Sequence, residues 1–368
     1  MREKHYFVCG HTAKGYVDLF RSNLEPLKKI YILMGGSMTG KLNVMKRIAS
    51  RLEEFTECVE YLHNPSNPEI LNGVLFPGLG IGIVDGSSSQ VLEVRAPGAI
   101  EEYVNLSESW DTAKLSCQRE KILDLRSRIE QCYEKAYTSF ANGLKVHDEW
   151  EKIYIENMNF EKADELTEYL ISSLFHDEHF NKAALILHRF LGGSTPYGPM
   201  DFVDNITAEI TTRYFIKGRP GSGKSTILKK LLQAAKERGI DSEVYHCGFD
   251  PDSLDMLLFP ELSICIFDST FPHEYYPSRE GDMIIDTYTE LINEGTDERH
   301  ADLLADIVAR YRVYTREGTA YLSEAKGYLE ELEQLYQNAT DFSMIDHKWN
   351  KLYLKIMNFH PQGPNIIT

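Results

Sequence analysis

Little in this sequence suits an exported or membrane-spanning protein. Its six cysteines are scattered without a C-x-x-C spacing, which argues against a zinc ribbon or a disulfide framework. No apolar run reaches about 18 residues, the length that crosses a membrane as a helix. The opening MREKHYFVCG lacks the apolar core of a signal peptide. The sequence therefore predicts a cytoplasmic protein without a membrane partner.

Positive charge is also scarce. Lysine and arginine number 39 against 56 aspartates and glutamates, which gives a formal net charge of −17. Phosphate backbones attract positive protein surfaces, so this balance argues against general nucleic-acid binding, although a local basic site is compatible with it. What the chain does have is length and apolar material. Its 368 residues, 42% of them hydrophobic, predict a folded protein of two domains.

The two domains are visible as an internal repeat with an offset of 183 positions. Identical residues in this register are His5 and His188, Tyr31 and Tyr214, Gly35 and Gly218, Lys41 and Lys224, His63 and His246, and Pro68 and Pro251. The register is lost in a helical region and returns at an offset of 199, where Trp150–Phe160 matches Trp349–Phe359. The repeat predicts a first domain at 1–160, a helical connector at 161–187 and a second domain at 188–368. We expect the two domains to pack as a pseudo-symmetric pair.

Each copy has the pattern of an α/β fold. Short runs rich in Val, Ile and Tyr alternate with helical segments, which predicts a parallel sheet with crossover helices. The predicted strands are HYFV, IYILM, ECVEYLH and LGIGIVD in the first copy and HRFL, RYFIK, SEVYHC and LSICIFD in the second. Beyond Gly98 and Gly281 the apolar spacing becomes helical, so we expect a helical subdomain at the C-terminal end of each copy.

A complete Walker A pattern stands between the second strand and the following helix of the second copy. It consists of Gly218, Arg219, Pro220, Gly221, Ser222, Gly223, Lys224, Ser225 and Thr226. Glycines at these spacings let backbone N–H groups surround a phosphate, and the helix that follows adds its positive end. Lys224 would bridge the β- and γ-phosphates, and the Ser225 hydroxyl would bind Mg²⁺. This segment predicts a nucleoside triphosphate site.

An acidic residue at the end of a neighbouring strand should complete the magnesium site. Asp268, at the end of ICIFD, fits this position; the alternative is an aspartate that only caps the next turn. Ser269 and Thr270 follow where many ATPases place a water-activating glutamate, which leans towards phosphoryl transfer or a slow switch. His273 lies on the same loop, at the sheet edge where ligands bind, and could contact phosphate or move a proton. An ordinary loop histidine fits equally well.

Further polar residues are candidates for contact with a second substrate. Asp250, Asp252 and Asp255 follow the third strand, where they could hold hydroxyl or cationic groups of a phosphoryl acceptor. Aspartates are equally common in turns and helix caps. Arg279 could clamp transition-state charge in the manner of an arginine finger, or could be a surface arginine. Both interpretations of each residue remain open at this point.

The first copy keeps part of this set, as a degenerate nucleotide site at Gly35, Gly40, Lys41 and Asp85. Leu42 replaces the magnesium-binding hydroxyl and Gln90 replaces the histidine, while Asn43 could partly stand in for the lost hydroxyl. Losing a metal ligand should damage turnover more than binding, because Mg²⁺ neutralises developing charge. We therefore expect chemistry in the second copy and non-productive nucleotide binding or a scaffold role in the first.

With both loops, the segments DSTFPH and DPDSLD, and the opening element H-x-F-x-x-G-x-T-x-x-G of each copy in hand, the chain resembles a family of bacterial tandem P-loop ATPase-like proteins. The resemblance covers nearly the whole length. It implies two P-loop domains in one chain and ATP binding, without naming a substrate. Leu42 and the segment GSSSQ depart from the pattern, which places the catalytic competence of the first copy in doubt.

Three functions are compatible with these features. The chain could be an ATP-hydrolysing switch, a kinase for a small molecule or nucleotide with the helical part as its lid, or a non-catalytic nucleotide-binding regulator. It lacks the LSGGQ signature of transporter ATPases and the NKxD motif of guanine recognition, so ATP with Mg²⁺ is the predicted ligand pair. The further partner is a small-molecule acceptor or a protein. We favour hydrolysis because it requires no unseen substrate.

Overall fold

The computed structural model describes residues 2–87 and 94–359, and the chain divides into two compact units. Unit 1 consists of Met1–Tyr6, Phe20–Tyr133 and Leu322–Thr368, and unit 2 of Phe7–Leu19 and Glu134–Tyr321. The units therefore do not coincide with the sequence repeats. The first repeat supplies Phe7–Leu19 and residues 134–160 to unit 2, and the second repeat supplies Leu322–Thr368 to unit 1.

Unit 1 is built on a sheet with the strand order β1-β5-β6-β7-β4-β8. Its strands are β1 (Arg2–Phe7), β4 (Lys29–Met34), β5 (Cys58–Asn64), β6 (Asn67–Phe76), β7 (Ile81–Asp85) and β8 (Glu101–Asn105). Strand β4 is parallel to both β7 and β8. The loops that follow these three strands therefore leave from one edge of the sheet, where ligands bind in α/β folds.

Unit 2 repeats this plan with the strand order β16-β12-β15-β14-β13-β9. Its strands are β9 (Ile186–Phe190), β12 (Thr212–Lys217), β13 (Ser242–His246), β14 (Leu254–Phe259), β15 (Ile264–Asp268) and β16 (Asp282–Asp286). Strand β12 is parallel to β15 and β16, as β4 is to β7 and β8. The predicted α/β class is confirmed, and the two units match strand for strand.

One strand in each unit departs from the predicted parallel sheet. Strand β6 is antiparallel to β5 and β7, and β14 is antiparallel to β13 and β15. The connections explain this, because a parallel crossover needs a dozen or more residues. Strand β5 ends at Asn64 and β6 begins at Asn67, and only the short turn η2 (Pro77–Leu79) with Gly80 separates β6 from β7. These two strands, NPEILNGVLF and LDMLLF, are absent from the strands that the sequence predicts.

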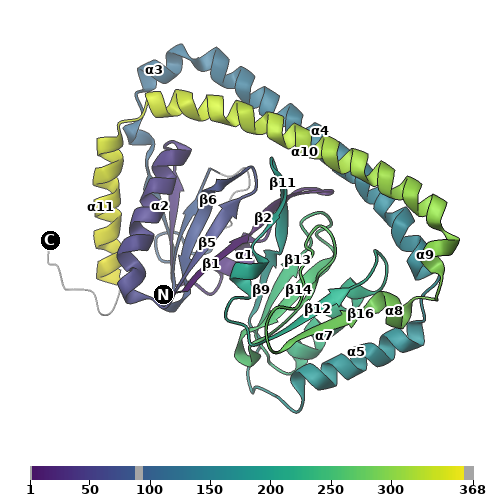
Figure 1. Cartoon of the computed structure of the whole chain (residues 1–368). Coiled ribbons are helices and arrows are strands. Elements are labelled where there is room, and N and C mark those ends of the chain that lie inside the picture. Colours follow the sequence, from purple (N-terminus) through teal and green to yellow (C-terminus); the bar gives the residue numbers. More distant parts are fainter. Residues whose placement is uncertain (1, 88–93, 360–368) are drawn as a thin grey trace. The chain divides into compact units, whose positions relative to one another are not determined.

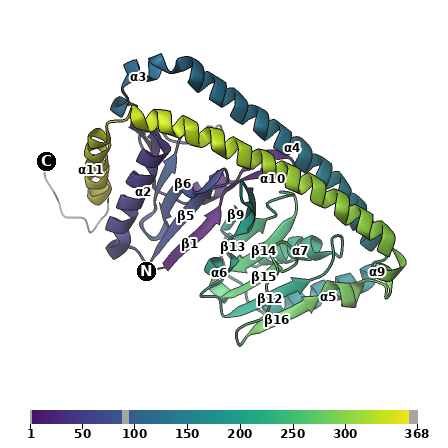
Figure 2. The ribbon, with the colours of Figure 1, turned by 45° about the horizontal axis from the view of Figure 1, so that its top comes forward.

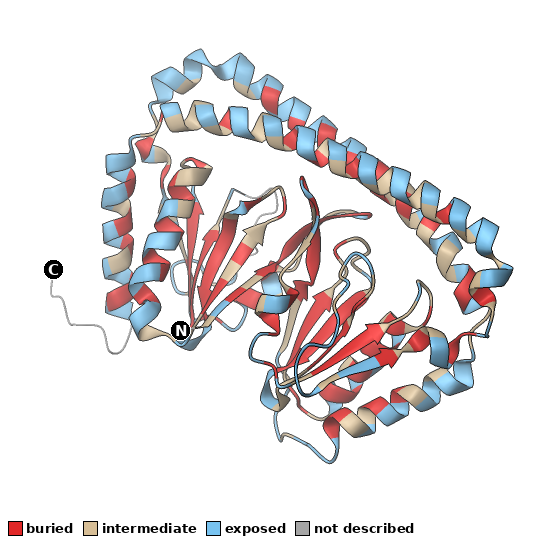
Figure 3. Cartoon of the chain, in the orientation of Figure 1, coloured by how far each residue is buried: buried red, intermediate tan, exposed pale blue. Residues whose placement is uncertain are grey.

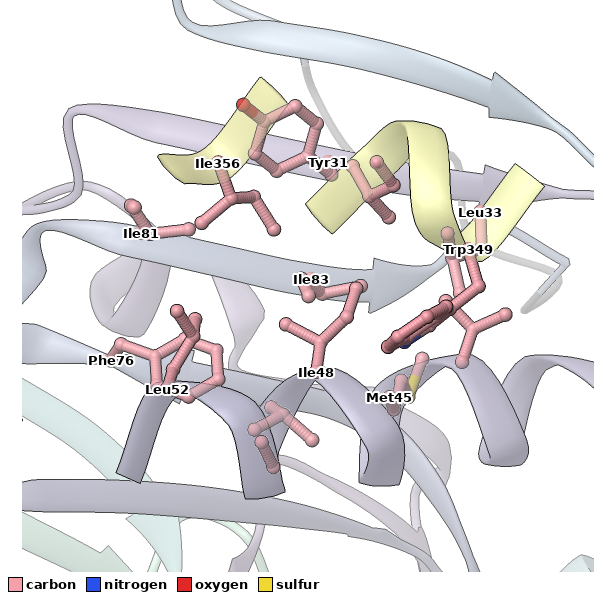
Figure 4. Close-up of a cluster of buried hydrophobic side chains, with 14 of the residues drawn as sticks. Tyr31, Leu33, Met45, Ile48, Leu52, Phe76, Ile81, Ile83, Trp349 and Ile356 are labelled. Carbon is pink, nitrogen blue, oxygen red and sulfur yellow. The ribbon is translucent and has the colours of Figure 1, made fainter. Parts of the chain in front are cut away.

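A helix pair covers one face of each sheet. In unit 1, α2 (Met38–Leu52) packs beside α11 (Phe342–Phe359), and Figure 4 shows Met45 and Ile48 in one buried cluster with Trp349 and Ile83. In unit 2, α7 (Lys224–Glu237) packs beside α5 (Phe160–Phe175) in the same way (Figures 1 and 2). Burial of one apolar stripe per helix is what stabilises such helices in water.

Two long helices, α4 (Arg119–Ile155) and α10 (Ala301–Asn338), contribute residues to both units. In unit 1 they meet through Leu125, Ile129 and Leu332, and in unit 2 through a cluster that includes Val146 and Ile307. Figure 3 shows their outer faces exposed and the strands of both sheets buried. The sequence predicted a helical subdomain within each copy, whereas each unit draws this helix pair from both copies.

The predicted helical connector at 161–187 is only partly helical. Helix α5 ends at Phe175, His176 has a φ of 45°, and the chain enters β9 at Ile186. Two hairpins, β2 (Cys9–Thr12) with β3 (Gly15–Asp18) and β10 (Gly192–Thr195) with β11 (Gly198–Asp201), both belong to unit 2. In residues 2–87 and 94–359 no helix is long and apolar enough to cross a membrane.

The remaining elements are short. They are α1 (Phe20–Leu24), η1 (Glu53–Phe55), η3 (Ser107–Ser109), α3 (Thr112–Cys117), α6 (Val203–Ile206), η4 (Pro260–Leu262), α8 (Thr287–Leu291) and α9 (Thr296–Arg299). Helix α8 matters for the site below, because its first residue, Thr287, contacts the loop that joins β12 to α7.

Candidate functional site

The second loop, residues 218–223, joins the end of β12 to the start of α7 in unit 2. Gly221 and Gly223 have φ values of 73° and 88°, in the left-handed region that strains a residue with a side chain. A Cβ on Gly218 would lie 2.2 Å from the Thr287 hydroxyl oxygen, and one on Gly221 would lie 2.4 Å from the Glu151 carbonyl oxygen. All three glycines are therefore required. Left-handed residues in such a loop make successive N–H groups converge into an anion-binding hollow.

Lys224, the first residue of α7, lies between the second loop and the end of β15. Its Nζ donates to the Arg219 carbonyl at 2.8 Å and lies 3.5 Å from the Asp268 carboxylate. The side chain is buried. Arg219 pairs with Asp297 at 2.9 Å, and Pro220 is half-buried. Lys224 therefore places a buried positive charge beside the second loop.

The two hydroxyl residues that follow Lys224 differ in their surroundings. Ser225 Oγ accepts a hydrogen bond from the backbone N of Leu254 at 2.9 Å, so it lies where α7 meets the start of β14. Thr226 is exposed on α7. Ser222, within the loop, bonds Thr287 at 2.8 Å and is fully buried. Of the three hydroxyls, Ser225 is the one directed toward the acidic strand ends.

Asp268 ends β15 and lies beside Asp255 of β14. The antiparallel register pairs Met256 with Phe267, so Asp255 and Asp268 are the next residues of the two strands. Burial, then the Asp268 charge, raises the pKa of Asp255 to about 6. Asp268 also accepts hydrogen bonds from the Thr270 amide and hydroxyl at 3.0 and 2.6 Å. Asp268 therefore caps a turn, and its carboxylate also lies beside Lys224.

His273 belongs to a buried polar network. Its Nδ1 lies 2.6 Å from Asp201 of β11, and the other Asp201 oxygen accepts from the Tyr275 hydroxyl at 2.6 Å. Burial alone would lower the pKa of His273, but the Asp201 hydrogen bond and the charge of Asp255 raise it above the ordinary value. A Cβ on Gly192 would lie 2.6 Å from the ring, so the β10–β11 hairpin fixes the imidazole in place. His273 is therefore held in a fixed position, where Asp201 and the nearby acids favour its protonated form.

Sequence reasoning missed three residues of α4 that face this site. His147, Asp148 and Glu151 bring ligand atoms within 4.8 Å of one another. Burial, then the Lys224 charge, lowers the pKa of His147 to about 4. Burial, then Asp148, raises the pKa of Glu151, which the Gly221 backbone also hydrogen-bonds. The spacing HDEWE was a visible signal for one helix face, but nothing local attached that helix of the first copy to the loop of the second.

The β2–β3 hairpin of the first copy also reaches this region of unit 2. The backbone N of Ala13 donates to the Phe249 carbonyl at 2.9 Å. The adjacent Lys14 pairs with Asp250 at 3.0 Å and with Asp252. Among the three aspartates predicted to meet a second substrate, these two are thus engaged by a lysine, whereas Asp255 lies beside Asp268.

Arg279 has a structural place. Its guanidinium donates to the carbonyls of Thr207 and Ala208, each at 3.0 Å, and its backbone N donates to Asp282. Asp282 in turn forms a buried ion pair with Arg213 at 2.6 Å. These contacts tie the segment before β16 to the end of α6, which favours a structural role over that of an arginine finger.

The first loop, residues 35–40 of unit 1, keeps glycines but not the same backbone. Helix α2 begins at Met38, whereas α7 begins at Lys224, three positions later in the aligned register. Met38 stands at the position of Gly221, where a left-handed φ would strain any side chain. Ser37 Oγ accepts a hydrogen bond from Gly40 N at 3.0 Å and so caps the earlier helix start. Part of the first loop is therefore helix.

A carboxylate from α10 accepts hydrogen bonds from the backbone amides at this helix start. Glu333 accepts hydrogen bonds from the backbone N of Met38 and of Thr39, both at 2.9 Å. Gln337, one turn further along α10, donates to the Thr39 hydroxyl at 2.6 Å and to Glu333 at 3.0 Å. Two N–H groups at a helix N-terminus favour an anion, and here the chain supplies that anion itself.

Lys41 and Asp85 form a closed pair in unit 1. The Lys41 Nζ lies 2.7 Å from each oxygen of Asp85 and also bonds Ser87. Lys41 is 3% exposed. Its counterpart Lys224 lies farther, 3.5 Å, from the matching carboxylate. The degenerate site thus has its lysine and its acid already bound to each other.

The other substitutions of the first copy agree with this picture. Leu42, in the place of the hydroxyl, packs against the apolar core of unit 1. Asn43 is exposed on α2, so it does not replace that hydroxyl. Asn72 stands at the position of Asp255 in the repeat. Gln90 lies outside the described residues.

Comparison with known proteins adds no relative to these observations, since no family model, curated protein or solved structure matches the chain. The function has to be argued from the residues of the two units.

Proposed function

We propose that the protein is a P-loop nucleoside triphosphatase that binds ATP with Mg²⁺ at the second loop. The observation that carries the proposal is the agreement between GRPGSGKST and its backbone: left-handed glycines, a buried Lys224 ammonium and the Asp268 carboxylate 3.5 Å away. A triphosphate with its metal needs converging N–H donors, a cation, a hydroxyl and a carboxylate. Residues 218–225 and Asp268 supply all four.

The donor set fits Mg²⁺, which prefers oxygen ligands such as hydroxyl and carboxylate groups. Ser225 and Asp268 would hold the ion, and when bound it would neutralise charge on the phosphates. Lys224 would exchange its hydrogen bond with the Arg219 carbonyl for phosphate oxygens. His273, fixed by Asp201, would place a positive charge beside the acidic strand ends. Helix α4 would exclude water from the loop, because its Glu151 backbone already contacts Gly221.

A kinase is the second candidate, and the acidic groups around the loop favour it. Burial, then the Asp250 charge, raises the pKa of Asp148, and burial, then the Asp148 and Asp250 charges, raises that of Glu151. Carboxylates held together in this way suit a phosphoryl acceptor with hydroxyl or cationic groups. The dipeptide after Asp268, Ser269-Thr270, also lacks the glutamate of many dedicated hydrolases.

For the first copy we propose a role without nucleotide turnover. Its loop amides are bonded to Glu333, its lysine is bonded to Asp85, and Leu42 offers no metal ligand. An incoming phosphate would have to displace the glutamate and break the ion pair. The first copy then acts as a structural partner that fixes the end of α10 on α2.

The deciding experiment measures ADP and phosphate released from Mg-ATP by the full chain, with and without a small-molecule cell extract. Lys224→Ala, which removes the loop's ammonium, is the control. Equal ADP and phosphate without extract would identify a hydrolase. ADP without matching phosphate, formed only with extract, would identify a kinase. ATP binding without ADP formation would leave a nucleotide-binding regulator, and absence of binding would overturn the proposal.

A further inference from the structure

The carboxylates of Asp255 and Asp268 form a like-charged pair between neighbouring strands. Met256 of β14 is paired with Phe267 of β15, so Asp255 and Asp268 are the next residues of the two strands, and the charge of Asp268 acts on Asp255. Like charges in this position destabilise a sheet. Asp255 is only 8% exposed, so water does little to offset the repulsion. The fold must balance this pair with positive charge.

The positive groups that act on Asp255 are Lys224 and His273, and each is shared with another acceptor. Lys224 donates to the Arg219 carbonyl at 2.8 Å. His273 is bound to Asp201 at 2.6 Å. If Lys224 turns to a phosphate, as the proposed function requires, the carboxylate pair loses part of its compensation.

A third oxygen lies beside the pair. Ser225 Oγ is hydrogen-bonded to the backbone N of Leu254, the residue immediately before Asp255. The Ser225 hydroxyl of α7 therefore lies at the start of β14, next to the residue that precedes Asp255. Hard divalent cations take oxygen donors of these kinds.

The first copy shows the same position with its charge balanced. Asn72 and Asp85 stand at the positions of Asp255 and Asp268 in the repeat, so the two positions carry one carboxylate instead of two. Lys41 lies 2.7 Å from both Asp85 oxygens and neutralises that charge directly. Leu42 removes the hydroxyl. Each of the three features that call for a cation in unit 2 is absent from the matching residues of unit 1.

We propose that Asp255 is a second carboxylate ligand of the divalent cation, acting together with Asp268 and Ser225. The inference rests on the proposed function in so far as it takes the latter two as magnesium ligands. It changes the role of Asp255 from contact with an acceptor to binding of the metal. It also gives a reason for the antiparallel strand β14, whose second residue is Asp255.

The test uses the nucleotide-free full chain and Mn²⁺ alone as the probe, with free Mn²⁺ measured by electron paramagnetic resonance. The unaltered chain should bind Mn²⁺, and Asp255→Asn should weaken that binding by about 10–100-fold, the loss seen when even supporting residues of metal sites are changed. Asp255→Asn should raise Tm without metal, because repulsion is relieved, and Mn²⁺ should no longer raise it further. Asn72→Asp, the matched change in the first copy, should leave the Mn²⁺ stoichiometry unchanged.

Two results would overturn the inference: equal Mn²⁺ affinity in Asp255→Asn and the unaltered chain, or no Mn²⁺ binding by the unaltered chain. The first would mean that the two carboxylates share a proton instead of a metal, a state that asparagine reproduces. Failure of the proposed function is separable from both. Mn²⁺ bound through Asp255 in a chain that binds no ATP would leave the cation site in place and remove the triphosphatase.

Discussion

The two loops of this protein share their glycine-lysine pattern and differ in backbone. In the second loop, Gly221 has a left-handed φ and helix α7 begins only at Lys224. In the first loop, Met38 stands at the position of Gly221, and helix α2 begins at Met38. A side chain that cannot adopt a left-handed φ without strain changes where a helix starts. A loop can therefore retain Gly35, Gly40 and Lys41 and still lose the backbone conformation of the second loop.

The loops also differ in how their charges are satisfied. In unit 1, Glu333 bonds the amides and Asp85 bonds the lysine, so the charged groups are paired within the chain. In unit 2, Lys224 bonds a carbonyl and lies 3.5 Å from Asp268, and the charge of Asp268 also acts on the buried Asp255. The charged groups of the first loop are paired within the chain, and we expect a ligand to stabilise those of the second. Four experiments separate the two.

The largest difference is expected between Lys224→Ala and Lys41→Ala. Lys224→Ala should lower ATP turnover by about 10²–10³-fold, the cost of removing one preorganised charge-stabilising group. Lys41→Ala should keep most turnover and instead lose about 3 kcal/mol of unfolding free energy, because it leaves Asp85 without its partner. Turnover and thermal unfolding measured on both variants check this. Equal loss of turnover in the two variants would contradict the assignment of chemistry to the second copy.

Next, Gly221→Met should give the second loop the residue of the first. The Met side chain would clash with the Glu151 carbonyl and strain the left-handed φ, so ATP binding should fall by at least about 10-fold. Calorimetric titration with Mg-ATP measures the loss. The matched change, Met38→Gly, should leave ATP stoichiometry unchanged because Glu333 still fills the amides. Wild-type affinity in Gly221→Met would show that the loop shape is not needed for binding.

Glu333→Ala should destabilise unit 1 by about 1–2 kcal/mol, the range found when a helix loses its N-terminal cap. Hydrogen exchange should become faster at the amides of Met38 and Thr39, and pyrophosphate should slow it again in this variant alone. Glu330→Ala, one turn earlier on α10 and exposed, is the control. Protection of the same amides by pyrophosphate in the unaltered chain would show that an external anion already displaces the glutamate.

The smallest effect concerns His273, where the first copy has Gln90. Asp201→Asn removes the charged hydrogen-bond partner that raises the pKa of His273, so that pKa should fall towards the lower value that burial favours. The raised pKa of His273 contributes stability that is fully present below the unfolded pKa of 6.5 and is lost as pH rises through the folded pKa. The lowered pKa of Asp201 contributes stability that is present above its unfolded pKa of 3.8. Asp201→Asn should therefore cost most stability between pH 4 and 6.5. Histidine NMR titration and pH-dependent unfolding measure both, and an unchanged pKa of His273 would refute the coupling.

Local features of both copies were predictable from the sequence. The strands that enter both loops, the helices that leave them and the acids Asp85 and Asp268 lie where periodicity and the repeat register placed them. The strand β14 was missed because a short apolar run before Pro260 carries no periodic signal of its own. Its pairing follows from the turn lengths, which become informative only once the strand is recognised.

The contacts that complete each site were not predictable from the sequence. Glu333 bonds Met38, and Lys14 bonds Asp250, across hundreds of intervening residues. Propensity and capping rules describe neighbours in the chain, and the repeat suggested that each copy would contain its own site. Instead, α4 of the first copy supplies Glu151 to the second loop, and α10 of the second copy supplies Glu333 to the first. The sequence of either copy, taken alone, carries no pattern that predicts such an exchange.

The division of the chain into units has a consequence for its inheritance. Unit 2 needs Phe7–Leu19 and residues 134–160 from the first repeat, and unit 1 needs Leu322–Thr368 from the second. A gene cut at the repeat boundary near residue 187 would yield two products, each lacking strands or helices of its own core. Deleting either repeat would therefore remove part of the other unit's fold. The first repeat is thus required by the unit that contains the second loop, whatever its own loop binds.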